Sequence, residues 1–200
     1  MLTERERAGI HRLWQRKLDQ DGQALPQSAR HRNLEPASAE LISALAAGMG
    51  ARRLLEIGGS SGLSTIALAA AARETGGRLI SIEIEPARQA EAGATLAELG
   101  LARWVEFILG DGAVVVPGIG AQDFVLIDCE KVDYVRFFDL LTLARGGVVV
   151  ADNILSHAIT EYVAHVRAWP GAESITLAVG KGLEVTRFPD GRAGMRAAAP

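Results

Sequence analysis

The sequence predicts an α/β fold with a seven-stranded, mostly parallel sheet, helices on both faces and an antiparallel hairpin strand near the C-terminus. Short apolar runs alternate along the chain with helical patterns, as in a parallel sheet covered on both sides. A glycine-rich turn joins the first run to its helix. The last two runs are separated by only three residues, which allows a hairpin and no parallel crossover.

The individual elements follow from the same alternation. The five expected parallel strands are residues 53–57, 79–84, 105–109, 124–128 and 147–152, and the hairpin pairs residues 174–179 with 183–188. Helices are expected at residues 3–19, 36–49, 63–73, 86–99, 132–143 and 157–168, with a short loop or helix at 111–117.

Length and composition exclude several classes of protein. The chain has 200 residues, 48% of them hydrophobic, which allows one domain with a substantial core and a short arm. The net charge of -3 argues against a nucleic-acid or membrane-surface partner, and no apolar run is long enough for a transmembrane helix. The N-terminus alternates charges without an apolar signal region, so a cytoplasmic location is the default expectation.

The first 33 residues are expected to form a helical arm or lid. They carry seven basic and four acidic side chains, and residues 21–33 are expected to be a linker. The helix is either a solvated amphipathic helix or an arm that covers the site or a second subunit. The expected domain organisation is therefore an arm at 1–33, a catalytic domain at 34–190 and a disordered tail at 191–200.

The glycine-rich turn lies in the stretch LLEIGGSSGLST, residues 54–65. Glycines let the backbone approach a ligand closely, and the helix start offers free N–H groups. A dinucleotide fingerprint is absent, because Ser60 and Leu63 stand where its second and third glycines belong. S-Adenosylmethionine, with an adenosine and an amino-acid end, is compatible with this turn. The alternative interpretation is a tight strand-to-helix turn with no ligand.

Polar side chains follow the expected strands at their carboxyl ends, where ligands bind in open α/β sheets. Glu83 is placed to accept hydrogen bonds from ribose hydroxyls, and Asp111 to contact an adenine amine. Taken singly, each acid is equally compatible with a helix N-cap or a solvated loop. Together they are expected to face one crevice: Glu56, Glu83, Asp111, Asp128, Asp152 and Asn153.

Asp128, Asp152 and Asn153 form a plausible oxygen-ligand set for a hard divalent cation. Lys131 is expected to reach the same cavity, where it is a candidate general base; its alternative is a surface residue at a helix start. The chain has only three lysines, at positions 17, 131 and 181, so the use of lysine at position 131 calls for an explanation. His157 is expected to be a pocket or helix-start residue, and Cys129, the one cysteine, a packed or pocket-lining thiol.

Six segments resemble the cation-dependent class I O-methyltransferases of the catechol and caffeoyl-coenzyme A types and their bacterial relatives. The resemblance covers residues 33–188, and the most specific part is I-D-x-x-K-x-x-Y followed by A-D-N. The segments are LLEIGGSSGLST, SIEIEP, GDGA, VLIDCEKVDYVRFFDLL, RGGVVVADNIL and GKGLEVTRF.

The resemblance implies a Rossmann-like methyltransferase fold and transfer of a methyl group from S-adenosylmethionine to a hydroxyl of a small catechol-like or vicinal-oxygen acceptor. It implies that Lys131 deprotonates the acceptor, that Asp128 acts beside it, and that Asp128, Asp152 and Asn153 bind Mg2+, Mn2+ or Ca2+. It also implies a homodimer. The implied cofactor-binding residues are Glu56, Gly58, Ser60, Gly62, Ser64, Glu83, Ile84, Asp111, Gly112, Ala113 and Asp128.

The sequence also departs from the family pattern. The usual D-A-D-K is Asp128-Cys129-Glu130-Lys131 here, and no glutamate after His157 matches the one that catechol enzymes place against the second hydroxyl. Three alternatives therefore stay open: a metal-independent methyltransferase on the same fold, a nicotinamide-dependent oxidoreductase, and a non-catalytic S-adenosylmethionine-binding module.

Overall fold

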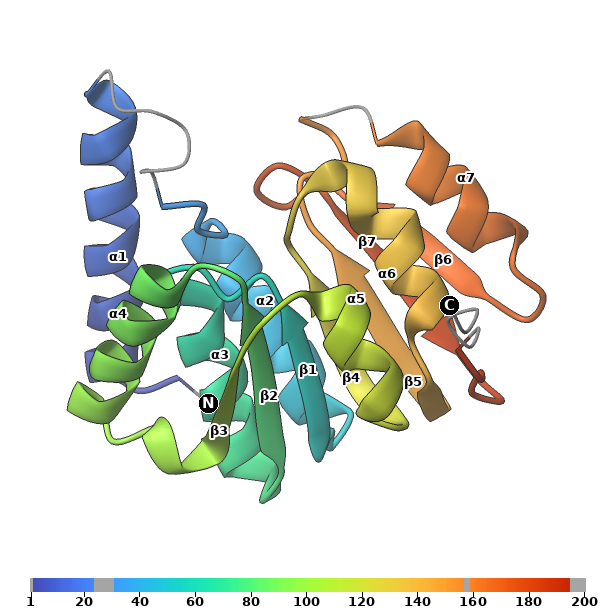
Figure 1. Ribbon diagram of the computed structural model, residues 1–200, viewed down its shortest axis with the longest axis horizontal. Helices are drawn as coiled ribbons and strands as arrows, with labels where there is room; N and C mark the ends of the chain where they lie inside the picture. Colours follow the sequence, from blue (N-terminus) through green and yellow to red (C-terminus); the bar gives the residue numbers. More distant parts are fainter. Residues whose placement is uncertain (1, 24–30, 157–158, 195–200) are drawn as a thin grey trace.

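Seven strands form one sheet in the order β3-β2-β1-β4-β5-β7-β6 (Figure 1). The computed structural model describes residues 2–23, 31–156 and 159–194. The strands are β1 (Arg53–Ile57), β2 (Arg78–Glu83), β3 (Val105–Leu109), β4 (Gln122–Ile127), β5 (Leu143–Ala151), β6 (Glu173–Leu177) and β7 (Leu183–Phe188).

The topology confirms the predicted mixed sheet. Strands β1 to β5 pair in parallel, while β7 runs antiparallel to both β5 and β6. The chain moves outward from β1 through β2 to β3 and then returns to the other side of β1 as β4. The crevice beyond the ends of β1 and β4 is therefore the topological switch point, where this class of sheet binds ligands.

The helices cover both faces of the sheet. They are α1 (Glu4–Gly22), α2 (Pro36–Gly48), α3 (Leu63–Thr75), α4 (Pro86–Glu98), α5 (Gly112–Val115), α6 (Tyr134–Leu140) and α7 (Thr160–Ala168). In Figure 1, α1 lies at one end of the molecule and α7 at the other. No helix among the described residues combines the length and the apolar character needed to cross a bilayer.

Alternate residues of the strands build two hydrophobic cores. On one face, Leu54 and Leu126 pack with α1, α2 and α3; on the other, Leu55 and Ile127 pack with α6 and α7. This alternation follows from the two-residue period of a strand. Ile10 and Leu13 of α1 belong to the first core. The N-terminal helix thus packs against the rest of the domain, and the division at residue 33 remains a prediction.

The region 132–143 differs from the predicted single helix. Residues 131–133 form a 3-10 turn, α6 ends at Leu140, and β5 begins at Leu143, four residues before the predicted strand. Leu143 exchanges backbone hydrogen bonds with Arg192, at 2.8 and 3.1 Å. These bonds stabilise an extended backbone at the point where the helix was expected to continue.

The C-terminal segment is ordered further than predicted. Besides its pairing with Leu143, Arg192 places its guanidinium 4.2 Å from the Phe138 ring centroid and 4.0 Å from that of Trp169. Stacking on these rings holds Arg192 against α6 and the end of α7. The remaining part of the predicted disordered tail, most of the 21–33 linker and His157 lie outside the described residues.

Candidate active site at the strand ends

The glycine turn brings the ends of β1 and β4 into contact. Gly58 has φ +96°, and a Cβ there would lie 2.3 Å from the backbone oxygen of Asp128. Gly62, at φ +100°, lies against Ala92 of α4 in the same way, with a Cβ at 3.0 Å from its Cα. Only glycine permits both the positive φ and the close approach. The turn therefore forms the floor of the crevice.

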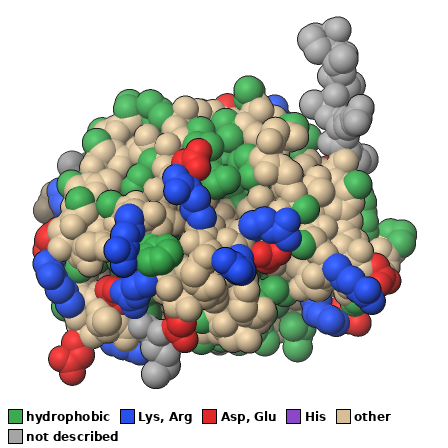
Figure 2. Space-filling view, turned by 90° about the horizontal axis from the view of Figure 1, so that it is seen from below, with side chains coloured by type: hydrophobic (Ala, Val, Ile, Leu, Met, Phe, Trp, Pro, Cys, Tyr) green, Lys and Arg blue, Asp and Glu red, His purple; other side chains and the backbone are tan. Residues whose placement is uncertain are grey.

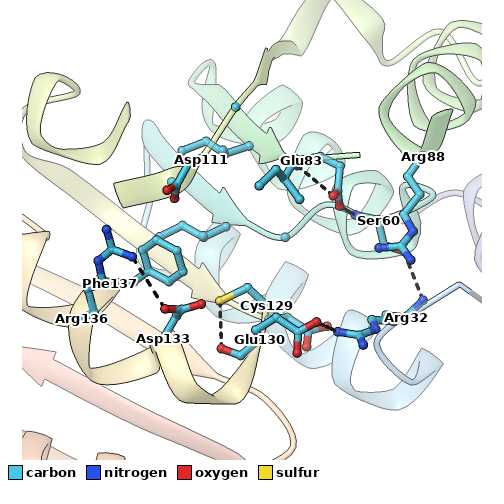
Figure 3. A pocket seen from close by; sticks show the side chains of 17 residues that line it. Arg32, Ser60, Glu83, Arg88, Asp111, Cys129, Glu130, Asp133, Arg136 and Phe137 are labelled. Carbon is cyan, nitrogen blue, oxygen red and sulfur yellow. Dashed lines mark hydrogen bonds and ion pairs between the residues drawn. The ribbon is translucent and has the colours of Figure 1, made fainter. Parts of the chain in front are cut away.

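The first cavity, of about 220 Å3, opens directly above this turn. Figure 3 shows Asp111 and Phe137 at one end and Arg32 and Arg88 at the other, with Glu83 between them. Its walls combine apolar and charged side chains. The lining residues include Ile57, Gly58, Ser60, Ile82, Glu83, Ile84, Gly110, Asp111, Gly112, Asp128, Cys129, Glu130, Asp133, Arg136 and Phe137.

Glu83 is buried at the end of β2 and holds the glycine turn in place. Its Oε2 accepts a hydrogen bond from the Ser60 backbone N–H at 2.7 Å, and its Oε1 accepts bonds from Ile84 and Glu85 at 2.9 and 3.0 Å. Ser60 has φ +48°. The carboxylate thus stabilises a left-handed residue and lines the cavity at the same time.

The far end of this cavity has a polar group and flat apolar surfaces. Asp111 Oδ1 accepts a hydrogen bond from the Ala113 backbone N–H at 2.8 Å, so it caps α5 as well as lining the cavity. Phe137 packs against Gly112, where an added Cβ would lie 2.9 Å from its ring. Ile84, which is 63% exposed, lines the wall of the same cavity. Such an arrangement suits a planar heterocycle with an exocyclic amine.

Four of the predicted cofactor residues do not line this cavity: Glu56, Gly62, Ser64 and Ala113. Glu56 is fully buried beneath the turn, where it accepts hydrogen bonds from Ser81 Oγ at 2.5 Å and Thr65 Oγ1 at 2.7 Å. Burial raises its pKa. The expectation that Glu56 faces the crevice is wrong in this structure, because its position inside β1 turns it toward α3 and β2.

A second cavity, of about 360 Å3, adjoins the first. Four residues line both cavities: Arg32, Asp128, Cys129 and Glu130. The other residues lining the second cavity are Lys17, Asp21, His31, Asn33, Lys131, Asn153 and Lys181. A molecule in the second cavity would therefore meet one in the first across the end of β4.

Asp128, Asp152 and Asn153 are brought together as predicted. The Asn153 Nδ2 atom lies 3.1 Å from Asp128 Oδ1 and 2.7 Å from Asp152 Oδ2. Burial and the neighbouring Asp128 carboxylate raise the pKa of Asp152 to about 8, and burial raises that of Asp128. Asp152 Oδ1 is buried and has no hydrogen-bond partner among the described residues. Two adjacent buried carboxylates with a spare oxygen are a natural cation ligand pair.

The amide is essential to this ligand set. Among the described residues, no three His, Cys, Asp or Glu side chains converge where they could bind a metal. Asn153 has φ +64°, which directs the residue back toward the carboxylates. Its nitrogen faces both acids, so binding of a cation by the amide oxygen requires the amide group to turn over.

Lys131 points into the same cluster. Its Nζ lies 3.2 Å from Asp128 Oδ1 and donates to Tyr134 Oη at 2.8 Å; the Tyr134 hydroxyl donates in turn to the Asp152 carbonyl at 3.2 Å. The 3-10 turn at residues 131–133 places the lysine and the tyrosine on one side. Tyr134 is the last residue of the sequence motif I-D-x-x-K-x-x-Y, which by itself predicts no role for it. The signal that could have identified Tyr134 is its position three residues after Lys131, a spacing that places two side chains on the same side of a helical turn.

Cys129 lies between the two cavities and is half-buried. Burial, and then the charge of Asp128, raise the pKa of its thiol. A thiol that holds its proton is a poor nucleophile, which agrees with the predicted pocket-lining role.

The end of α1 closes the second cavity. Lys17 and Asp21 line it, and Asn33 donates to the Leu13 carbonyl at 3.4 Å and accepts from Ser61 Oγ at 3.0 Å. The Arg32 backbone N–H also donates to Ser60 Oγ, at 3.2 Å. The segment after residue 30 thus connects the N-terminal helix to the glycine turn, and the role of that helix as a cover remains a prediction. Sequence patterns did not identify Arg32 or Asn33.

The opposite edge of the sheet, where the parallel strands begin, has a different surface. Figure 2 shows Lys and Arg side chains beside Asp and Glu side chains on this side of the molecule. Arg53 pairs with Asp123 at 2.7 Å and Arg78 with Glu106 at 3.2 Å. Both cavities described above lie at the other edge of the sheet, where the parallel strands end.

Known protein families and curated sequences show which proteins this chain resembles. A protein-family model described as O-methyltransferase matches residues 18–168. Catechol O-methyltransferase from Mycobacterium tuberculosis is 36% identical over 120 residues, which are 58% of this chain and 54% of that protein. Catechol O-methyltransferase from Niastella koreensis is 32% identical over 130 residues, 62% of this chain and 58% of that protein. The matches thus span little more than half the length of these relatives.

Solved structures extend the similarity over most of the fold. TomG from Streptomyces achromogenes, an O-methyltransferase solved in complex with SAM, has a TM-score of 0.75 and 26% identity over 94% of this chain and 91% of that one. Cofactor-bound Rv0187 from MTB has a TM-score of 0.76 and 25% identity over 92% of this chain and 90% of that one. The observed sheet has the Rossmann-like methyltransferase topology predicted from sequence.

Proposed function

Because the chain belongs to the O-methyltransferase family, we propose that it transfers a methyl group from S-adenosylmethionine to a hydroxyl of a small acceptor with vicinal oxygens, assisted by a divalent cation. The observation that supports this most directly is the pair of cavities that share a wall at Asp128, Cys129 and Glu130. One cavity has apolar faces with acids at positions suited to an adenosine. The other is lined by Lys131, Asp128 and Asn153, and Asn153 is hydrogen-bonded to Asp152.

The first cavity is the proposed cofactor site. Glu83 would accept hydrogen bonds from the ribose hydroxyls, and Asp111 would accept one from the adenine amine between Ile84 and Phe137. Gly58 and Asp128 line the same cavity, where the methionine part would lie. Contacts of the cofactor with Glu56, Gly62, Ser64 and Ala113, which do not line the cavity, remain predictions.

The second cavity is the proposed acceptor site. The acceptor oxygen attacks the methyl carbon while the bond from that carbon to sulfur breaks, leaving S-adenosylhomocysteine. Lys131 takes the hydroxyl proton through its Nζ, and Tyr134 holds that nitrogen toward the acceptor. Positioning the two reacting atoms in adjacent cavities supplies part of the rate.

The residues at and beside the shared wall fit a divalent cation: Asp128 lines both cavities, Asn153 lines the second, and Asp152 is hydrogen-bonded to Asn153. Asp128, Asp152 and Asn153 would hold it, and the unpartnered Asp152 Oδ1 has the chemistry of a ligand for Mg2+ or Mn2+. When bound, the cation would polarise two adjacent acceptor oxygens and lower the pKa of the one that attacks. Its charge would also offset the repulsion between Asp128 and Asp152.

The test is a calorimetric titration of Mn2+ into protein saturated with S-adenosylhomocysteine, alongside an assay of methyl transfer to catechol with and without chelator. One-site binding that disappears in Asp152→Ala, together with turnover that chelator abolishes, is the expected result. Asp123→Ala is the matched control, because Asp123 lies at the opposite edge of the sheet and pairs with Arg53. No Mn2+ binding to the wild type would overturn the cation-dependent reaction.

One observation favours a second candidate, a metal-independent methyltransferase on the same fold. Lys131 and the Asn153 amide already hydrogen-bond Asp128, so the cluster is partly satisfied without a cation. Turnover that survives chelation and the Asp152→Ala substitution would establish this alternative. The predicted cytoplasmic location and homodimer remain expectations; size-exclusion chromatography with light scattering tests the dimer.

A further inference from the structure

All three lysines of the chain line the second cavity. Arginine supplies the other 18 of the 21 basic residues, yet Lys17, Lys131 and Lys181 come together here from α1, the turn before α6 and the loop between β6 and β7. Lysine presents a compact charge with three donors, whereas arginine presents a rigid fork. Three ammonium groups from three separate elements therefore line one cavity.

The lining is unusually polar for an acceptor site. Of the described residues that line the cavity, every one except Cys129 has a charged or strongly polar side chain. Small-molecule pockets are usually lined mainly by apolar and aromatic groups. A neutral, apolar aromatic acceptor would therefore bury little hydrophobic surface here.

Two of the lysines have donors to spare. Lys17 is 8% exposed and pairs with Asp21, which uses one of its three N–H groups. Lys181 approaches Glu35 Oε1 only to 3.9 Å, beyond hydrogen-bond distance, and its side chain is 38% exposed. Lys131, by contrast, is engaged by Asp128 and Tyr134 at the reacting end.

The cavity lining carries a small excess of positive charge when Lys131 is protonated. Among the described lining residues, four are basic (Lys17, Arg32, Lys131 and Lys181) and three are acidic (Asp21, Asp128 and Glu130), which leaves one positive charge. His31 adds none at neutral pH, because burial lowers its pKa. The whole chain has a net charge of -3, so this excess is local.

We propose that the acceptor carries a carboxylate, which Lys17 and Lys181 bind while its vicinal oxygens lie at Lys131 and Asn153. This inference rests on the proposed function, since it concerns the acceptor of the same reaction. A carboxylate is opposite in charge to this lining and accepts the spare N–H groups of two lysines from different elements. The lysines thereby select the acceptor and orient its hydroxyls.

The test compares two acceptors of equal size, 3,4-dihydroxybenzoate and 3,4-dihydroxybenzamide, by kcat/KM for S-adenosylhomocysteine formation. Wild type should prefer the carboxylate by about tenfold or more, since charge-assisted hydrogen bonds are at stake. Lys17→Met and Lys181→Met should each reduce this preference, mainly by raising KM for the benzoate. Lys181→Arg should retain most of it.

Arg12→Met is the matched control on α1, because Arg12 pairs with Glu98 outside the cavity and its loss should leave the preference intact. Lys181 is half-exposed, so its variant remains informative even if Lys17→Met fails to fold. Equal turnover of both acceptors by wild type would overturn the carboxylate inference and leave the methyl-transfer proposal standing.

Absence of turnover with either acceptor would count against the proposed function, and binding then decides the carboxylate inference separately. The probe is calorimetric titration of each acceptor into protein saturated with S-adenosylhomocysteine. Tighter binding of the benzoate, lost in Lys181→Met, supports the lysine site. Equal binding, no binding, or a preference that survives Lys181→Met overturns it.

Discussion

The Nζ atom of Lys131 lies 2.8 Å from the phenolic oxygen of Tyr134, and that oxygen lies 3.2 Å from the backbone carbonyl of Asp152. This chain of hydrogen bonds links the proposed base to the strand end that supplies the proposed cation ligands. Tyr134 is fully buried, and burial raises its pKa well above the usual value, so its hydroxyl stays protonated. We therefore expect Tyr134 to act as a positioning residue for Lys131.

Replacing this tyrosine tests that role. Tyr134→Phe should lower kcat by roughly tenfold to a hundredfold, because the lysine amine loses the partner that orients it. Affinity for S-adenosylhomocysteine should change little, since Tyr134 does not line the first cavity. Steady-state kinetics and calorimetry on the same preparation separate the two quantities.

Tyr162→Phe is the control for Tyr134→Phe. Tyr162 packs edge-on against Tyr134 with ring centroids 5.5 Å apart, and its hydroxyl has no hydrogen-bond partner among the described residues. Removing that hydroxyl should leave kcat unchanged and stability equal or slightly higher. An equal loss of kcat in both variants would contradict a specific role for the Tyr134 hydroxyl.

A second prediction concerns the stability of the cation-free protein. Burial and Asp128 raise the pKa of Asp152 from 3.8 to about 8. A proton bound more tightly in the folded state stabilises it at low pH, and this contribution declines as pH rises from about 4 to about 8. The unfolding free energy of wild type relative to Asp152→Asn should therefore fall across this window.

Urea unfolding at several pH values measures that difference. Saturating Mn2+ should restore wild-type stability at the upper end of the window and leave Asp152→Asn unaffected, because a cation bound to the folded state offsets the ionised carboxylates. A pH-independent difference between the two proteins would mean that Asp152 titrates normally.

A third prediction separates backbone strain from close packing at the glycine turn. Gly58→Ala places a Cβ 2.3 Å from the Asp128 backbone oxygen at φ +96° and should cost about 2–4 kcal/mol of stability. Gly76→Ala, at φ +67° with nothing within 4 Å, should cost only about 1 kcal/mol. Equal losses of unfolding free energy in the two variants, measured by chemical denaturation, would show that the ends of β1 and β4 are not in tight contact.

A fourth prediction concerns the cofactor site. Glu83→Gln should weaken S-adenosylhomocysteine binding by about tenfold or more. Both carboxylate oxygens of Glu83 accept backbone N–H groups and are available to the ligand, whereas the amide of glutamine has only one acceptor oxygen. Glu85→Gln, exposed at the next turn, is the control and should bind normally. Unchanged affinity in Glu83→Gln would place the ribose elsewhere.

The sequence predicted the sheet well because each strand is a short apolar run between turn-forming residues, a local signal. It failed at residues 132–143, where hydrogen bonds from Arg192 to Leu143 decide between helix and strand. A partner 49 positions away leaves no trace in a local pattern. The same limit explains why residues 191–194 were expected to be disordered.

For the site, the sequence by itself determined which chemical groups stand at the strand ends, because the parallel strands all end at one edge. Asp128, Lys131, Asp152 and Asn153 follow from that rule and come together in the structure. The tertiary structure alone decided that Glu56 turns inward, that Tyr134 holds Lys131, and that Lys17 and Lys181 share a cavity. These relationships depend on how the elements pack, and packing joins residues whose separation along the chain carries no information about their distance in space.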